Sequence, residues 1–179
     1  PLTLSVRSER SRRRAEQICR YKSGKYTIER PLHLGAVLAG PDRAAELLPA
    51  LSAYGLPLGD AFQMRDDVMG AFGDPAVTGK PVGGDLREGK PTPLMARAVE
   101  RADGVQAGVL ALVGRPDLTD EQVSQVQQVI VDSGALADLE RTIDRLTDDA
   151  VAAIALAQLP PQARDEPVAL AAYVSRRAV

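Results

Sequence analysis

Apolar residues recur at steps of three and four over a long segment near the carboxyl end of the chain, and this spacing constrains the fold more than any other feature. The positions are Leu136, Leu139, Ile143, Leu146, Ala150 and Ile154. Because an α-helix turns once in about 3.6 residues, they form one stripe along a single helical face, and such a stripe is usually packed in a core. The sequence has no strand-like alternation of useful length and no internal repeat. With 45% hydrophobic residues, the 179-residue chain can bury a sizeable core. The pattern therefore predicts an all-α fold, with residues 1–179 as a single domain.

Glycines, prolines and capping residues predict where the other helices begin and end. The Gly40-Pro41 step splits residues 36–58 into two short predicted helices. The other predicted boundaries are a helix over 94–101 behind Pro93, a helix from a Thr119–Gln122 capping box to Gly134, and a last short helix over 167–179 after Pro160-Pro161.

A paired carboxylate lies in the sequence Phe62-Gln63-Met64-Arg65-Asp66-Asp67. On a helix, Gln63, Asp66, Asp67 and Gly70 share one face. Adjacent carboxylates repel each other unless a cation neutralises them, and Mg²⁺ takes one or two carboxylates together with substrate phosphate oxygens. Taken alone, the pair is more often solvated surface, as we expect for Asp148-Asp149.

The following segment, Gly73–Thr92, is rich in glycine and proline and therefore excludes a continuous helix or a central strand. It carries Lys80 and Lys90. Glycines allow the backbone to approach an anion closely, and lysine supplies a mobile positive charge for phosphate. An exposed loop kept soluble by its charges is the alternative, and two lysines beside an acidic pair disfavour it.

A third group of polar residues lies upstream in Arg20-Tyr21-Lys22-Ser23-Gly24-Lys25-Tyr26-Thr27, and Pro31 is expected to limit this helix. Lys22 and Tyr26 are four residues apart and would share a face of an α-helix, with the hydroxyl of Ser23 beside them. By itself, this triplet is as well explained by packing.

Composition excludes several functions. A net charge of −2 gives no general attraction to nucleic acid or anionic lipid, and 3% aromatic residues disfavour stacking on single strands. The single cysteine, Cys19, is expected to be buried, and one cysteine cannot form an intramolecular disulfide, which favours the reducing cytoplasm. His33 is expected to be a packed or surface residue. No apolar run approaches the ~20 residues of a membrane span.

The ordered strings FQMRDD, FGDPAVTGK, GGDLREGK and YKSGKYTIERPL together resemble the carboxyl-terminal half of the trans-isoprenyl diphosphate synthases, and the actinobacterial geranylgeranyl type in particular. The resemblance is close over about 17–90 and looser beyond. It implies an all-α isoprenoid synthase bundle around a cavity, in which Mg²⁺ joins an allylic diphosphate to isopentenyl diphosphate. By motif position, it implies metal binding by Asp66 and Asp67, diphosphate binding by Lys22, Lys80 and Lys90, a zone around the allylic cation lined by Gln63 and Ser23, and a pocket for isopentenyl diphosphate shaped by Phe62.

The sequence departs from that family pattern in three places. Ser23 replaces the more usual threonine and keeps the hydroxyl, and Gly70 stands where many members have a third aspartate, with Asp74 one turn on. No first aspartate-rich motif occurs in these residues, so the amino-terminal half of the fold is expected to be missing from them and this fragment alone to be inactive. A non-catalytic partner subunit of a heteromeric synthase is the alternative, and a terpene cyclase is a weaker one. The resemblance also implies a homodimer.

Overall fold

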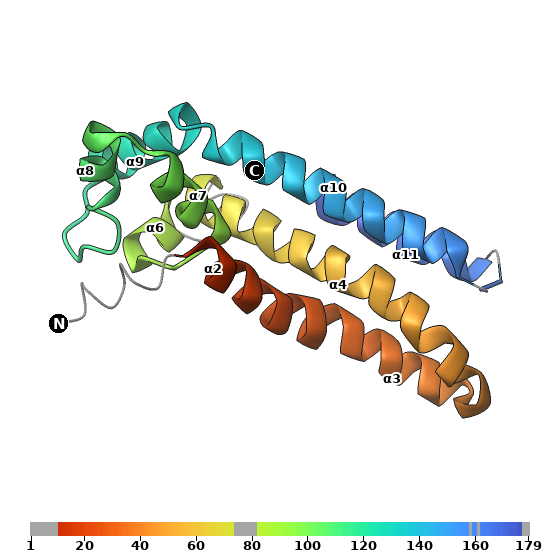
Figure 1. Ribbon diagram of the computed structural model, residues 1–179. Coiled ribbons are helices and arrows are strands. Elements are labelled where there is room, and N and C mark those ends of the chain that lie inside the picture. Colours follow the sequence, from red (N-terminus) through yellow and green to blue (C-terminus); the bar gives the residue numbers. More distant parts are fainter. Residues whose placement is uncertain (1–10, 74–81, 158, 161, 177–179) are drawn as a thin grey trace. The chain divides into compact units, whose positions relative to one another are not determined.

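A computed structural model describes residues 11–73, 82–157, 159, 160 and 162–176. Every regular element among these residues is a helix, so the predicted all-α class is confirmed (Figure 1). The chain divides into two compact units. Among the described residues, unit 1 comprises 11–16, 66–73 and 82–141, and unit 2 comprises 17–65, 142–157, 159, 160 and 162–176. The single domain over residues 1–179 stays a prediction.

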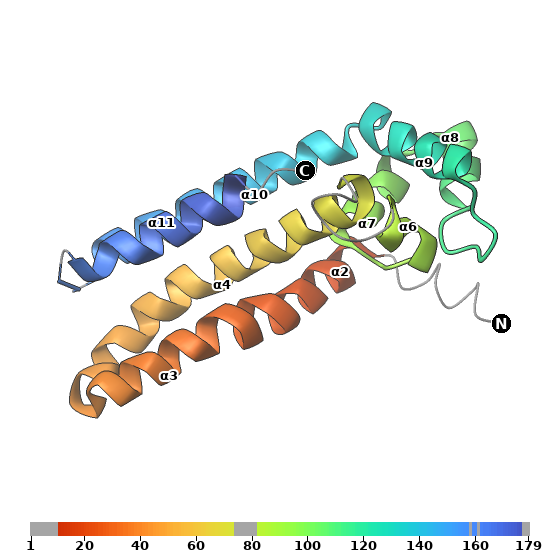
Figure 2. The same ribbon diagram turned by 180° about the vertical axis from the view of Figure 1, so that it is seen from behind.

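Unit 2 is built from long helices packed side by side. They are the π-helix η1 (Arg20–Glu29), α3 (Arg30–Ala39), α4 (Pro41–Phe72) as far as residue 65, α10 (Ala135–Leu156) from residue 142, and α11 (Gln162–Arg176). In both views the continuous run of η1 and α3 lies beside α4, and α11 lies beside α10 (Figures 1 and 2). Tyr54 is fully buried, and its hydroxyl donates a hydrogen bond of 2.8 Å to the carbonyl of Pro167, which joins α4 to α11. Burial raises the pKa of Tyr54 to about 12.

Glycines bring η1 and α4 into backbone contact. A Cβ atom placed on Gly59 would lie 2.5 Å from the Cα of Gly24 and 2.7 Å from the carbonyl oxygen of Ser23. Farther along the same crossing, a Cβ on Gly55 would lie 3.2 Å from the Cα of Glu29. Since real carbon–carbon contacts optimise near ~3.5–4.0 Å, only glycine permits this separation of the two helices.

Unit 1 consists of shorter helices: the first part of α2 (Arg12–Cys19), the end of α4, α6 (Gly84–Glu88), α7 (Pro93–Arg101), α8 (Gly104–Leu110), α9 (Asp120–Asp132) and the start of α10. Arg97 of α7 is fully buried in this unit. Its guanidinium donates to Asp138 at 3.0 Å, to Glu16 at 3.1 Å and to the carbonyl of Pro93 at 3.2 Å. This buried network ties α7 to α2 and α10.

Local capping signals gave correct helix boundaries. Pro93 begins α7, and Thr119 and Gln122 form the predicted capping box at the start of α9. Gly134 follows α9 with a left-handed φ of 73°, the conformation that favours glycine after a helix.

Two proline-based predictions were wrong. The helix after Gly40 is not short, because α4 runs for 32 residues through Pro49 and Pro57. Likewise α11 begins at Gln162 and contains Pro167. Packing of neighbouring residues, such as the fully buried Leu58, outweighs the local penalty of proline.

Pro31 does not limit the preceding helix either. It lies in the first turn of α3, which continues directly from η1. There the N–H of Arg30 donates to the carbonyl of Lys25, five residues back. This wider turn carries the helical run into Pro31 without a break.

Among the helices of the described residues, none is long and apolar enough to cross a membrane.

Candidate functional site

The residues that the sequence singled out fall into one group in each unit. Unit 2 contains Lys22 and Ser23 on η1 and Phe62 and Gln63 on α4. Unit 1 contains Asp66 and Asp67 on the last turns of α4, together with Lys90 after α6. Lys80 lies outside the described residues.

In unit 2, Ser23 and Gln63 form a buried hydrogen bond. The Ser23 hydroxyl donates to the Oε1 of Gln63 at 2.7 Å, and both residues are buried at 3% and 7% exposure. The two residues are 40 positions apart, and the close crossing of η1 and α4 brings them together. Because Oε1 accepts this proton, the amide nitrogen of Gln63, which can only donate, is directed away from Ser23. The hydrogen bond thereby fixes which end of the amide faces η1.

An ion pair that sequence reasoning missed lies beside this hydrogen bond. The Nη2 of Arg20 is 2.6 Å from the Oδ2 of Asp60, whose side chain is 8% exposed. Gly24 leaves room for this carboxylate, since a Cβ on Gly24 would lie 3.0 Å from the Oδ1 of Asp60. The available signal was the spacing of Asp60 and Gln63, which are three residues apart on one helical face.

The other two predicted residues of unit 2 differ in burial. Lys22 is exposed, and Phe62 is half-buried. An exposed ammonium next to the buried Ser23 is suited to meet a charged group arriving from solvent. Elsewhere in the unit, Cys19 is buried, and His33 Nε2 lies 2.9 Å from Ser52 Oγ, so both are packed residues as predicted.

In unit 1, Asp66 is half-buried and Asp67 is buried at 5% exposure, both on α4. The residues that the structure describes contain no cluster of three or more His, Cys, Asp or Glu side chains able to hold a metal. The two adjacent carboxylates nevertheless fit Mg²⁺, which keeps several waters and completes its shell with substrate phosphate oxygens. Asp66 and Asp67 are the described residues that could hold such an ion, and their assignment to it stays a prediction.

Lys90 is anchored by acidic residues of α6. Its ammonium forms ion pairs with Asp85 and, at 3.2 Å, with Glu88. Partial burial alone would lower the pKa of Lys90, but the hydrogen bonds and charges of Asp85 and Glu88 outweigh it and raise that pKa. Gly83 and Gly89 bracket α6 with φ values of 65° and 68°, a left-handed conformation that glycine adopts without strain. Lys90 is thus held protonated at the end of a short, glycine-bounded helix.

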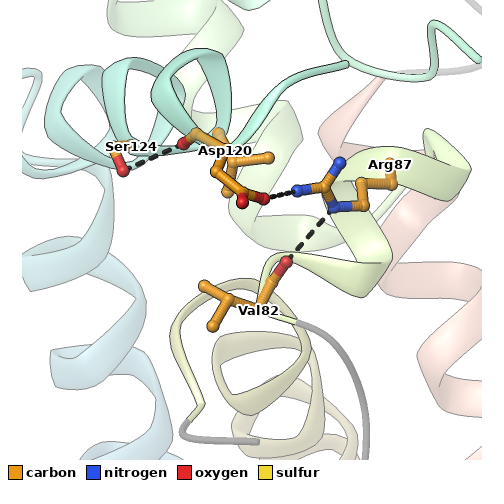
Figure 3. A pocket seen from close by; sticks show the side chains of 5 residues that line it. Val82, Arg87, Asp120 and Ser124 are labelled. Atoms are coloured by element: carbon orange, nitrogen blue, oxygen red, sulfur yellow. Dashed lines mark hydrogen bonds and ion pairs between the residues drawn. The ribbon is translucent and has the colours of Figure 1, made fainter. Parts of the chain in front are cut away.

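A pocket of about 760 Å³ opens on another side of α6, where it is lined by Val82, Arg87, Asp120, Val123 and Ser124. Figure 3 shows Arg87 directed at Asp120, with which it forms an ion pair. Arg87 also donates to the carbonyl of Leu118, at the entry to α9. These bonds attach α6 to the start of α9, and the pocket contains none of the predicted site residues.

Comparison with known proteins identifies the class first. A geranylgeranyl pyrophosphate synthase from Corynebacterium glutamicum, solved with isoprenyl diphosphate and magnesium, matches 99% of this chain with a TM-score of 0.90 and 39% identity. A polyprenyl synthase from Caulobacter crescentus, solved with calcium and isoprenyl diphosphate, matches 98% with a TM-score of 0.81 and 30% identity. The chain thus has part of the all-helical isoprenoid synthase fold, since it matches 50% of the Corynebacterium chain and 55% of the Caulobacter chain.

The family follows from the sequence comparison. The model of the polyprenyl synthetase family matches residues 4–130, so the chain belongs to this family. A geranylgeranyl diphosphate synthase from Mycobacterium tuberculosis is 34% identical over 145 residues, which are 80% of this chain and 40% of that protein. A geranylfarnesyl diphosphate synthase from Aeropyrum pernix is 42% identical over 117 residues, which are 65% of this chain and 35% of that protein. The chain thus spans less than half the length of these two relatives and 50% of the Corynebacterium structure.

Proposed function

We propose that the protein is a magnesium-dependent prenyltransferase that condenses an allylic diphosphate with isopentenyl diphosphate. The product would be a longer polyprenyl diphosphate in the farnesyl to geranylgeranyl range. The observation that carries the proposal is the buried Ser23–Gln63 hydrogen bond at 2.7 Å, which joins two of the motifs that define the resemblance. Family membership and the Asp66-Asp67 pair on the same helix as Gln63 support it.

The metal site would be formed by Asp66 and Asp67 together with diphosphate oxygens. Bound Mg²⁺ would supply charge neutralisation for the departing diphosphate. The two aspartates would hold their carboxylates on one helical turn, with Asp67 fixed by burial and Asp66 facing the more open side. Water and diphosphate oxygens would complete the coordination of the ion.

By motif position, as the family resemblance implies, the lysines would bind the same diphosphate. Lys90, which its acidic neighbours keep protonated, and the exposed Lys22 would stabilise the negative charge that develops as the leaving group departs. Lys80 is assigned to the diphosphate by motif position alone.

The reaction would proceed by ionisation, condensation and elimination. The allylic carbon–oxygen bond breaks, and its electron pair leaves with the diphosphate. The double bond of isopentenyl diphosphate attacks the allylic carbon, and a proton then passes to the released diphosphate. Ser23 and Gln63 would line the zone of the cation with oriented dipoles, and their burial is consistent with a site that excludes water. Phe62 would shape the pocket for isopentenyl diphosphate.

The test uses the full natural protein, because this chain spans half the length of its solved relative. Purified protein is incubated with isopentenyl diphosphate, Mg²⁺ and dimethylallyl, geranyl or farnesyl diphosphate, and the products are identified by mass spectrometry. We expect chain elongation, and a fall in kcat of roughly a hundredfold or more in Asp66→Asn. Asp148→Asn is the matched control, since this exposed aspartate belongs to the same dipeptide sequence elsewhere.

Binding provides a readout independent of turnover. Calorimetry with inorganic diphosphate should show affinity that rises with Mg²⁺ in the unaltered protein and loses this dependence in Asp66→Asn. Elongation without a requirement for Asp66 would contradict the metal assignment. No elongation, combined with a changed product length when a complete synthase is added, would favour the partner-subunit alternative. We also propose a homodimer, as the family resemblance implies, in the reducing cytoplasm that the single cysteine favours.

A further inference from the structure

The carboxylate of Asp85 occupies the space over Gly70. A Cβ atom on Gly70 would lie 2.2 Å from the Oδ2 and 2.4 Å from the Cγ of Asp85. No side chain, that of aspartate included, fits at position 70 unless Asp85 moves. Gly70 lies on α4 four residues after Asp66, and four residues rise about 6 Å along an α-helix. Asp85 is therefore seated about one turn from the proposed metal carboxylates.

Asp85 is also the better fixed of the two acidic partners of Lys90. The side chain of Asp85 is 8% exposed, whereas that of Glu88 is 65% exposed. The backbone reinforces the pairing, because the N–H of Lys90 donates to the carbonyl of Asp85 at 3.1 Å. An exposed ion pair contributes little orientation, while a buried carboxylate in contact with α4 has few alternative positions. The geometry of the Lys90 ammonium thus depends chiefly on Asp85.

We propose that Asp85 is a positioning residue: seated on Gly70, its carboxylate holds the Lys90 ammonium near the Asp66-Asp67 turn, where the lysine meets the substrate diphosphate. The inference rests on the proposed function, which assigns Lys90 to the diphosphate. It adds that a side chain at position 70 would displace the Asp85 carboxylate, because Asp85 uses that space.

The direction in which Asp85→Asn changes diphosphate affinity shows whether Asp85 acts by positioning Lys90 or only by its negative charge. Removing a negative charge close to a bound anion should, by Coulomb's law alone, tighten diphosphate binding. Losing the orientation of Lys90 should weaken it. Asp85→Asn keeps nearly the same shape over Gly70 and removes the charge, so the two effects give opposite results.

The experiment measures the affinity of the full natural protein for inorganic diphosphate with Mg²⁺ by calorimetry. We expect Asp85→Asn to weaken binding about tenfold, the equivalent of one charge-assisted hydrogen bond, and Glu88→Gln to have a smaller effect. Unchanged or tighter binding in Asp85→Asn would overturn the proposal. Lys90→Ala distinguishes a failure of the proposed diphosphate site from a failure of the positioning role alone. If it leaves affinity unchanged, the assignment of Lys90 to the diphosphate fails, and this inference fails with it. If Lys90→Ala weakens binding and Asp85→Asn does not, only the positioning role fails.

A double-mutant cycle tests the role of Gly70. Gly70→Ala should weaken diphosphate binding severalfold by displacing Asp85, and it should have no further effect in the Asp85→Ala background. Additive losses of affinity would show that Gly70 does not act through Asp85. They would contradict the proposal that the Asp85 carboxylate is positioned by its contact with Gly70. Gly108→Ala is the control, because Gly108 is also helical but a Cβ atom placed on it would meet nothing within 4 Å. Unfolding curves of each variant confirm that the comparison is between folded proteins.

Discussion

Replacing Gly59 by alanine should separate η1 from α4 and weaken the site in unit 2. The added Cβ would lie 2.5 Å from the Cα of Gly24. Reaching an ordinary contact of ~3.5–4.0 Å requires the backbones to move apart by about 1–1.5 Å. The same movement would stretch the 2.7 Å hydrogen bond between the Ser23 hydroxyl and Gln63 Oε1 beyond the ~3.0 Å limit of good O–H···O geometry.

The magnitude follows from three terms. Overpacking costs about 1–3 kcal/mol, and the lost hydrogen bond about 1 kcal/mol. The better helix propensity of alanine offsets these by up to about 1 kcal/mol. We therefore expect Gly59→Ala to lower the free energy of unfolding by about 2 kcal/mol and to reduce kcat.

Urea unfolding followed by circular dichroism measures the stability change, and the elongation assay measures kcat. Gly35→Ala on α3 is the matched control, since a Cβ there would meet nothing within 4 Å. This control should be stabilised by about 0.5–1 kcal/mol. If Gly59→Ala is as stable as Gly35→Ala, the reasoning from backbone contact is refuted.

Two further predictions concern the buried arginine of unit 1. Arg97→Ala should lower the free energy of unfolding by about 3 kcal/mol in urea titrations, because Asp138 and Glu16 lose their common partner; a loss below about 1 kcal/mol would contradict the network. Burial alone would raise the pKa of Asp138, but the Arg97 hydrogen bond and the charge of Arg101 outweigh it and lower that pKa below its ordinary 3.8. A carboxyl with a lowered folded-state pKa stabilises fully above 3.8, and this contribution is lost as the pH falls through the folded value. Unfolding measured between about pH 5 and pH 2 should therefore show a loss that is smaller in Arg97→Ala, and equal slopes would exclude this origin.

Helix ends with local signals could be predicted from the sequence. The capping box of Thr119 and Gln122 and the left-handed Gly134 are confirmed because each depends on residues only a few positions away. The length of α4 could not be predicted in this way. Pro49 and Pro57 indicate interruptions locally, but the packing that overrides them comes from distant segments.

In the candidate site, too, features set by nearby residues could be predicted, and contacts between distant segments could not. Helical spacing was enough to put Gln63 and Asp66-Asp67 on one helix, and α4 contains all of them. The family resemblance implied that Ser23 and Gln63 line one zone, but it did not predict the hydrogen bond between them. The Arg20–Asp60 ion pair and the seating of Asp85 on Gly70 were missed, because each depends on how closely two backbones approach in three dimensions. The assignments of Lys22, Phe62, Lys80 and Lys90 to substrates stay predictions.

Gly89, at the end of α6 and next to Lys90, crosses the segment at Gly114, and neither residue has a side chain at the crossing. A Cβ on Gly89 would lie 2.8 Å from the Cα of Gly114, and both glycines have left-handed φ values of 68° and 85°. The N–H of Gly114 also donates to the carbonyl of Leu86 at 2.9 Å, which fixes the crossing. In a saturation mutagenesis experiment, both positions should tolerate almost no replacement, because a side chain at either would meet the backbone of the other. The replacements that residues 84–90 can accept are thus limited by their contact with Gly114. A library that varies residues 84–90 freely would consist mostly of proteins in which Lys90 is displaced.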